Sequence, residues 1–296
     1  MKDLSGNYGP VVIGGVGGSG TRVVAEILLH FGFFMGKDLN PAKDNLSYTL
    51  LFKRPEWFKK NFQNKNKLET GFSILNKSLY SGESLSIKEK IFLWNAVRDM
   101  AKHGHNREGQ GKGDWAKQRA AYIKFPQRLK TERYKGWGWK EPNSHLLIPV
   151  MAEYFPDFKY VHTVRHGLDM AYSGNQQQLY NWGDLFGIDI PEKEEDVPAA
   201  SFRYWTEVNK KVLAFGEQLG NERFLQVNFD RLCEAPEEGI MRIADFLKVN
   251  IPEDVMKKAF KLPVLPESKG RYKDYPLDGF SPEDLDYLEK MGFDYR

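Results

Sequence analysis

A run of glycines after a short apolar segment is the first feature that could do chemistry. Residues 14–21 read Gly-Gly-Val-Gly-Gly-Ser-Gly-Thr and directly follow the apolar residues 11–13. Apolar residues then recur at helical spacing up to Phe31, so the pattern predicts a strand, a glycine loop and a helix. Backbone N–H groups at such a helix start bind phosphate, because small side chains let the anion approach. We predict an anion site rather than a bare turn, formed by Gly17, Gly18, Ser19, Gly20, Thr21 and Arg22.

Two common nucleotide motifs fit this loop only in part. Gly15, Gly17 and Gly20 satisfy the spacing of dinucleotide-binding proteins, and Asp38 lies near the distance at which a ribose-binding acid is expected. The phosphate loop of ATP-binding proteins is a poorer match, because Thr21 and Arg22 stand where it requires lysine and then serine or threonine. ATP hydrolysis therefore loses its main cation, whereas an NAD-dependent oxidoreductase stays an alternative.

Several segments resemble sulfotransferases that use 3′-phosphoadenosine-5′-phosphosulfate, in particular the bacterial, tyrosylprotein and heparan branches. Residues 19–22, with Glu26 on the helix that follows, are similar to the family's 5′-phosphosulfate loop. Residues 161–173 are similar to its 3′-phosphate motif, a strand that ends in arginine and a helix that carries serine. The segments before and after them resemble further family motifs in the family's order, and they are residues 139–142, 227–232 and 268–271.

The resemblance implies a role for each matching residue. The glycine loop would hold the 5′-phosphosulfate, and Arg165 and Ser173 would bind the 3′-phosphate, for which a bidentate guanidinium is well shaped. The last segment, with Lys269, Gly270 and Arg271, would close over the nucleotide. Sulfuryl transfer follows the logic of phosphoryl transfer, with in-line attack and charge building on the leaving oxygen. Arginine and lysine would neutralise that charge, so we expect no metal.

One position departs from the family pattern. The family usually has lysine or arginine immediately before the Ser-Gly-Thr, where it touches the bridging oxygen, and here that position is Gly18. We expect Lys140 to be the substitute, because the matching lysine of tyrosylprotein sulfotransferases reaches the sulfonate. Arg22 is the second candidate, and a solvated lysine at a strand end is the structural alternative for Lys140. A nucleotide-binding module without catalysis is a further interpretation of Gly18.

The general base is less well defined by the sequence. It should be a carboxylate or histidine near the acceptor's hydroxyl or amine. In the branches resembled here it is commonly a glutamate after the second strand, and no glutamate occupies that loop. Asp38 and Asp44 lie in this stretch and are candidates, although each could also cap a turn or helix. Glu141 is a further option, with orientation of Lys140 as its alternative role.

Strands and helices alternate around these residues. We predict strands near 11–13, 33–35, 158–164 and 224–229, with helices at 143–154, 201–219 and 236–247 and from the turn at 165–167 through Gln178. Residues 46–130 form a helical insertion, with helices at 46–52, 55–62, 69–80 and 86–100 and a mobile loop at 103–114. The expected fold is therefore α/β, of the P-loop NTPase-like three-layer type with a central parallel sheet. We expect one sulfotransferase domain over 1–296, with the insertion on the acceptor side.

Composition excludes several other classes of protein. Apolar residues make up 41% and charged residues 28%, and the formal charge of +3 lacks the basic excess of nucleic-acid-binding proteins. No stretch approaches the roughly 20 apolar residues of a membrane-spanning helix, and no secretory signal is recognisable. A single cysteine, Cys233, favours a reducing compartment, so we expect a cytoplasmic protein. The acceptor, whether a small molecule, a glycan or a peptide, is not identified by the sequence.

Overall fold

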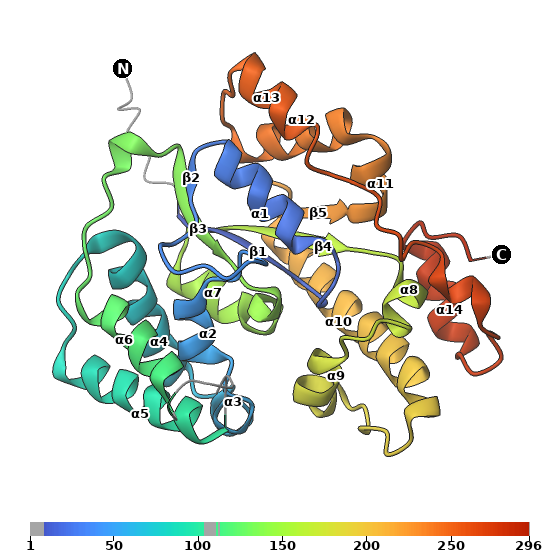
Figure 1. Cartoon of the computed structure of the whole chain (residues 1–296), viewed down its shortest axis with the longest axis horizontal. Coiled ribbons are helices and arrows are strands. Elements are labelled where there is room, and N and C mark those ends of the chain that lie inside the picture. Colours follow the sequence, from blue (N-terminus) through green and yellow to red (C-terminus); the bar gives the residue numbers. More distant parts are fainter. Residues whose placement is uncertain (1–8, 104–110, 112, 296) are drawn as a thin grey trace. The chain divides into compact units, whose positions relative to one another are not determined.

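The computed structural model describes residues 9–103, 111 and 113–295. Five strands form one parallel sheet with flanking helices, in the order β2-β3-β1-β4-β5 (Figure 1). The strands are β1 (Val11–Gly15), β2 (Phe33–Phe34), β3 (Gly136–Lys140), β4 (Lys159–Val164) and β5 (Phe224–Asn228). Every residue of β1 and β4 is buried, as expected for strands covered on both faces. The predicted α/β fold with a central parallel sheet is thereby confirmed.

The chain divides into two compact units, and each is described here by itself. The first unit contains the described residues of Met1–Val12, Leu28–Glu141 and Leu147–Phe158. The second unit contains Ile13–Ile27, Pro142–Leu146 and the described residues of Lys159–Arg296.

Helices make up most of the first unit. The helices are α2 (Leu46–Phe52), α3 (Pro55–Asn61), α4 (Lys65–Asn76) with the π-helical turn η1 (Lys77–Ser81), α5 (Ile87–His103), α6 (Asp114–Lys124), the 3-10 turn η2 (Thr131–Arg133) and α7 (Ile148–Tyr154). Helices at the four predicted places are confirmed, and α6 is an additional one. The pattern of α6 is weak because only Trp115, Ala116 and Ile123 along it are buried. The predicted loop 103–114 lies largely outside the described residues.

Aromatic side chains form the core of the first unit. Phe72 contacts Phe52, Trp139 and Phe155, with ring centroids 4.7, 6.4 and 5.9 Å apart. All four side chains are at most 8% exposed. Burial of aromatic rings of this size supplies much of the free energy that holds a helical layer to a strand. This cluster therefore fixes the end of β3, where Lys140 is the last residue.

Helices also surround the strands of the second unit. They are α8 (Gly167–Ala171), α9 (Gln177–Trp182), α10 (Val197–Leu219), α11 (Phe229–Glu234), α12 (Pro236–Leu247), α13 (Glu253–Ala259) and α14 (Pro282–Lys290), with 3-10 turns η3 (Pro142–Leu147), η4 (Gly183–Phe186), η5 (Glu194–Asp196) and η6 (Arg271–Asp274). Strands β4 and β5 pair in parallel from Tyr160 opposite Phe224 to Val164 opposite Asn228. The helix α1 (Thr21–His30) begins at the glycine loop, as predicted.

The predicted helix through Gln178 is wrong. The chain forms the short helix α8, leaves the helical conformation over residues 173–176, and begins α9 at Gln177. The side-chain amide of Gln176 donates to the carbonyls of Met170, Ala171 and Ser173, at 3.0, 2.9 and 2.7 Å. These bonds satisfy carbonyls that a longer helix would have bonded itself. Ser173 therefore lies in the break between two helices and not on a helix.

Two other predicted helices differ at their first residues. The helix predicted from Asn143 begins as the 3-10 turn η3 and becomes α-helical only at Ile148, where Pro149 follows at a favoured position. The helix predicted from Ser201 begins at Val197, again with a proline in its first turn.

Candidate active site

The glycine loop is held against the neighbouring strand by buried polar contacts. The hydroxyl groups of Ser19 and Thr163 lie 2.9 Å apart, and Ser19 is 1% exposed. The Gly17 N–H donates to the Gln178 side-chain carbonyl at 2.8 Å. A Cβ atom at Gly15 would lie 2.4 Å from the Thr163 carbonyl oxygen, so only glycine fits there. The Ser19 hydroxyl therefore braces the loop, which leaves the loop's backbone as its means of binding a ligand.

Two glycines of the loop adopt a backbone conformation that other residues avoid. Gly18 has φ of +95° and Gly20 has φ of +87°. A side chain at Gly20 would also collide with the Phe229 ring, 2.1 Å away. The loop leads directly into α1, where the N–H groups of Thr21 and Arg22 have no acceptor within the helix, whereas that of Val23 donates to the Gly20 carbonyl at 3.0 Å. This end of α1 combines orphan donors with the positive end of the helix dipole, which suits phosphate.

Arg165 follows β4 and carries a buried guanidinium. The residue is 8% exposed, and burial lowers the pKa of its side chain. One terminal nitrogen, Nη2, donates to the Ser268 hydroxyl at 2.8 Å. The Nε–H is buried and has no hydrogen-bond partner among the described residues. An unpaired buried donor on a cation is costly, and a bound anion would satisfy it.

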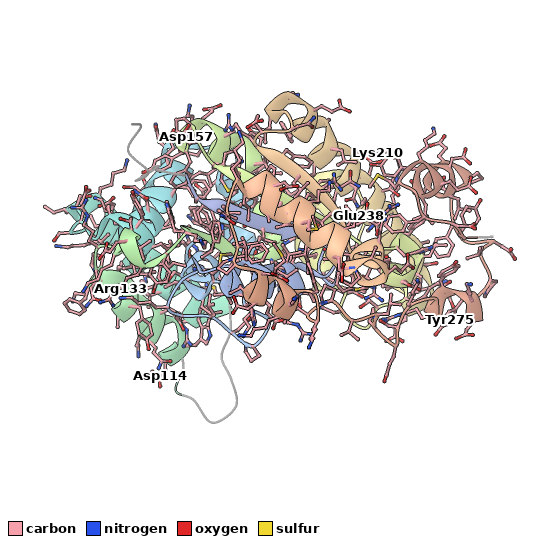
Figure 2. All side chains as sticks on the ribbon, turned by 90° about the horizontal axis from the view of Figure 1, so that it is seen from above. Asp114, Arg133, Asp157, Lys210, Glu238 and Tyr275 are labelled. Atoms are coloured by element: carbon pink, nitrogen blue, oxygen red, sulfur yellow. The ribbon has the colours of Figure 1, made fainter. Side chains whose placement is uncertain are left out.

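The segment around residues 268–271 lies close to the break after α8. The Gly270 N–H donates to the Asp169 carboxylate at 2.9 Å, and Arg271 donates to the Tyr172 carbonyl at 3.2 Å. Lys269 forms an ion pair with Glu234. Tyr172 also stacks on Tyr275, with ring centroids 4.0 Å apart; Tyr275 is labelled in Figure 2. The structure therefore brings the predicted closing residues next to the segment that contains Ser173.

Lys140 and Asp44 are paired in the first unit. The Lys140 ammonium forms an ion pair with the Asp44 carboxylate and donates to the Ala42 carbonyl at 3.0 Å. Asn40 donates to the same carboxylate at 2.8 Å. The Lys140 side chain is 3% exposed and that of Asp44 is 18% exposed. Lys140 is therefore not the solvated lysine that a strand end commonly carries.

Asp38 has a different partner. Its carboxylate lies 3.2 Å from Nε of Arg119 on α6, and the two side chains are 12% and 15% exposed. Burial raises the pKa of Asp38 despite the opposing charge of Arg119. Strand β2 ends at Phe34, so Asp38 does not end that strand as the dinucleotide interpretation requires. The other predicted cation, Arg22, is exposed in the first turn of α1.

The predicted site residues thus fall into two groups, each within one unit. The second unit contains the glycine loop, Arg22, Arg165, Ser173 and the segment 269–271, whereas the first contains Asp38, Asp44 and Lys140. Sequence reasoning did not identify Asp169, Gln178 or Arg119. The sequence could have indicated Asp169, because it lies close after Arg165, in the first turn of α8. No local pattern marked Gln178 or Arg119, whose partners lie 161 and 81 residues away.

The described part of the chain lacks two kinds of feature. No group of three or more histidine, cysteine, aspartate or glutamate residues is arranged to hold a metal ion. No described helix has both the length and the apolar character needed to cross a bilayer.

A glycine loop between a buried parallel strand and a helix defines an α/β protein of the P-loop-like class. A model of the sulfotransferase family matches residues 10–253, which is most of the chain. The chain therefore belongs to the sulfotransferase family, and it is an enzyme of the transferase class. The match includes the glycine loop, Lys140, Arg165 and Ser173, and it ends before residues 269–271.

Sulfotransferases are among the solved structures to which the chain is similar. The sulfotransferase domain of the Synechococcus PCC 7002 olefin synthase is 15% identical, with a TM-score of 0.49 over 98% of this chain and 97% of that one. The sulfotransferase domain from the curacin biosynthetic pathway is 13% identical, with a TM-score of 0.48 over 97% and 99%. Sulfotransferase STF1 of Mycobacterium tuberculosis H37Rv is 10% identical, with a TM-score of 0.41 over 86% and 70%. No curated protein sequence matches this chain.

Proposed function

We propose that this sulfotransferase takes its sulfonate from 3′-phosphoadenosine-5′-phosphosulfate and transfers it to a hydroxyl or amine. The observation that carries the proposal is Arg165, a buried guanidinium with an unpaired Nε–H beside a segment rich in further donors. A donor molecule with a phosphosulfate on the 5′ position and a phosphate on the 3′ position of its ribose matches a site with two separate anion-binding features.

The two features divide the donor between them. The backbone N–H groups of Gly18, Gly20, Thr21 and Arg22 would hold the 5′-phosphosulfate. Those of Gly17 and Ser19 already donate to Gln178 and to the Val16 carbonyl. Arg165, with Ser173 and the segment 269–271, would hold the 3′-phosphate. All of these residues belong to the second unit, so the nucleotide contacts need no residue from the first. Preorganised donors of this kind stabilise charge without reorganising during the reaction.

Lys140 would supply the cation that the glycine loop lacks at Gly18. It is the last residue of β3, and ligands of parallel α/β sheets bind beyond the carboxyl ends of the strands. Its bonds to Asp44 and to the Ala42 carbonyl hold the ammonium in a defined place. Neutralisation of the leaving group by lysine and arginine needs no metal ion.

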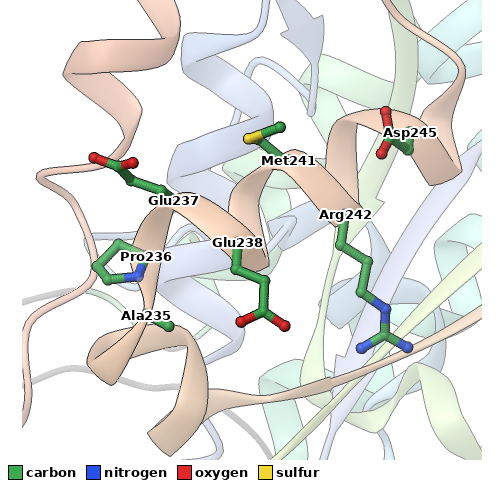
Figure 3. Close-up of a pocket in the computed structure, with 7 residues that line it drawn as sticks. All are labelled: Ala235, Pro236, Glu237, Glu238, Met241, Arg242 and Asp245. Carbon is green, nitrogen blue, oxygen red and sulfur yellow. The ribbon is translucent and has the colours of Figure 1, made fainter.

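Titration with adenosine 3′,5′-bisphosphate tests this proposal. We expect tight binding that weakens by about 10- to 100-fold in Arg165→Ala, because hydrogen bonds to charged groups contribute about 1.5–3 kcal/mol. Arg242→Ala is the matched control. Arg242 is an exposed arginine of the second unit, one turn after Glu238 on α12, and both side chains extend from the same side of that helix (Figure 3).

The same titration with NAD and ATP separates the alternatives. Tighter binding of NAD than of the bisphosphate would contradict the proposed donor. Equal losses in Arg165→Ala and Arg242→Ala would show that Arg165 has no special role in binding.

A further inference from the structure

The helix α5 of the first unit carries two apolar stripes, and only one of them is buried. Leu93, Ala96 and Met100 are at most 6% exposed, and the helix packs against α2, α4 and α6. In Figure 1, α5 lies on the side of these helices that faces away from β2 and β3. The buried stripe therefore accounts for the packing of α5 in the helical insertion.

The second apolar stripe of α5 faces solvent. Ile87, Ile91 and Trp94 are 78%, 55% and 58% exposed. Their spacing of four and then three residues places them on one face of the helix, opposite the buried stripe. A single exposed apolar side chain is common on a protein surface, whereas several on one face indicate contact with a partner. The second stripe adds nothing to the packing of α5, so we looked to its surroundings for the nature of that partner.

Exposed cations of the same helix surround the solvent-facing stripe. They are Lys88, Lys90, Arg98 and Lys102. Helical spacing places Lys90 on one side of the stripe, and Lys88 and Lys102 on the other. The Arg98 guanidinium lies 4.5 Å from the centre of the Trp94 ring. The exposed face of α5 is therefore apolar along its middle and basic along both edges.

The carboxylates of α5 do not neutralise this face. The helix has two acidic residues, Glu89 and Asp99. Glu89 is 5% exposed and pairs with Lys77 at 2.9 Å, and Asp99 pairs with Arg54 at 2.6 Å. Both carboxylates are thus engaged by cations from outside α5. The four exposed cations of α5 give its outer face a positive charge, which is complementary to an anionic surface.

We propose that the outer face of α5 binds the surface of an anionic phospholipid bilayer, with the helix lying in the plane of that surface. The lysines and the arginine contact acidic head groups, while Ile87, Ile91 and Trp94 enter the boundary between head groups and acyl chains. Tryptophan is enriched at that boundary, because its ring is apolar and its N–H is polar. The inference goes beyond sulfonate transfer and does not depend on the proposed donor.

Two other kinds of partner fit this face less well. A second copy of the chain, bound through the same face, would place the cations of one α5 against those of the other. A nucleic acid or a sulfated glycan would pair with the cations but leave Ile87 and Ile91 in water. A bilayer surface satisfies the cations and the apolar side chains together, and it needs no matching hollow in the protein.

Co-sedimentation of the whole chain with vesicles tests this proposal. We expect binding to phosphatidylcholine vesicles that contain about 30% phosphatidylserine, little binding to phosphatidylcholine alone, and weaker binding at high salt. Lys88→Gln combined with Lys90→Gln should weaken binding by about 25-fold, because each lysine near an anionic surface contributes about fivefold. Ile91→Ser should weaken it by about tenfold through lost apolar contact. All three residues are exposed, so these variants should fold, with unchanged affinity for the bisphosphate.

Matched controls come from the second unit. Lys257→Gln combined with Lys258→Gln makes the same change of net charge on α13, and Val264→Ser changes an apolar residue that is 70% exposed. Neither should alter vesicle binding. Equal losses in the α5 variants and these controls would overturn the proposal, as would equal binding to neutral and anionic vesicles or no binding to either.

Two further measurements separate the other partners. Binding to heparin without binding to vesicles would assign the face to a soluble polyanion instead. A dimer in sedimentation velocity that Ile91→Ser dissociates would assign it to a second copy of the chain. Either result would overturn the membrane proposal and leave the proposed sulfonate donor unaffected, because that donor is tested by titration with the bisphosphate.

Discussion

The cation that the family usually carries at the position of Gly18 is proposed to come from Lys140 in this chain. Gly18 is exposed at φ of +95°, a conformation in which a lysine would be strained. A lysine placed there would therefore have to alter the loop before its ammonium could act. Lys140 meets no such obstacle, because its backbone is part of β3 and its side chain is already fixed by Asp44.

Replacement of Lys140 by methionine tests this relocation. Lys140→Met keeps most of the side-chain volume and removes the charge. We expect turnover to fall by at least about 100-fold, as for loss of an electrostatic contact to a leaving group, with bisphosphate affinity within about twofold. The bisphosphate lacks the sulfonate, so it should not report on Lys140.

Lys159→Met is the matched control for that substitution. Lys159 is also a buried lysine, 8% exposed, and it donates to the carbonyls of Glu222 and Phe246 at 2.9 and 2.6 Å. Both variants should lose stability in thermal unfolding, but only Lys140→Met should lose turnover per folded molecule. Full activity of folded Lys140→Met would mean that the cation comes from elsewhere, with Arg22 as the next candidate.

At the scale of elements, α8 connects the 3′-phosphate residues with the closing segment. Asp169 is 1% exposed, and its carboxylate accepts the N–H groups of Gly270 at 2.9 Å and Tyr272 at 3.4 Å. The same segment is bonded by Arg165 through Ser268. A carboxylate that accepts backbone N–H groups forms strong, charge-assisted bonds. We infer that Asp169 holds residues 268–272 in position without touching the nucleotide.

Limited proteolysis with trypsin tests this positioning role, since the segment offers cleavage sites after Lys269, Arg271 and Lys273. In Asp169→Asn, the amide nitrogen cannot accept an N–H group, so we expect cleavage at these sites to be about tenfold faster. Bisphosphate affinity should fall by a similar factor, and saturating bisphosphate should slow the cleavage. Asp274→Asn makes the same change at an exposed position just after the segment, at the end of η6, and should behave as the unaltered protein. Unchanged cleavage in Asp169→Asn would show that the segment is held by other contacts.

For the whole molecule, buried histidines predict a loss of stability in mild acid. His145 and His162 are 4% and 0% exposed, and burial lowers the pKa of each from 6.5 to about 4. The unfolded chain therefore binds protons at higher pH than the folded chain does. Stability is complete above pH 6.5 and falls between about pH 6.5 and 4, by up to about 1.4 kcal/mol per pH unit for each histidine. Hydrogen bonds from Ser73, Lys77 and Ser86 lower the pKa of Glu89 from 4.5 to about 2. The stability that this carboxylate contributes is therefore lost as the pH falls below 4.5.

Urea unfolding between pH 7.5 and 4.5 measures this dependence. His162→Gln removes one of the two titrating side chains, so we expect the slope of unfolding free energy against pH to decrease by about 1.4 kcal/mol per pH unit. The exposed His103 offers a comparison, since His103→Gln should leave the slope unchanged. A free energy of unfolding that stays constant over this range would contradict burial of the two neutral rings.

Local patterns in the amino-acid sequence predicted the features that form over short distances along the chain. The glycine run predicted the loop, and apolar periodicity predicted β1, α1 and most of the helical insertion. These signals are local because a turn or a helix face is specified within one or two turns of chain. The same local patterns predicted one helix through Gln178, and that prediction was wrong. The α8 helix has only five residues, and the Gln176 side-chain amide donates to the carbonyl of its last residue, Ala171.

Contacts between distant parts of the chain set which of the candidate residues for the chemistry lie together. Asp44 pairs with Lys140 across 96 residues and Asp38 with Arg119 across 81, and no periodicity in the chain relates such positions. The sequence named Asp38 and Asp44 as equal candidates for the base. The fold gives each carboxylate its own cation, because it pairs Asp44 with the ammonium of Lys140 and Asp38 with the guanidinium of Arg119. Pairing and burial are set by how the chain folds back on itself, and that depends on contacts that no local pattern contains.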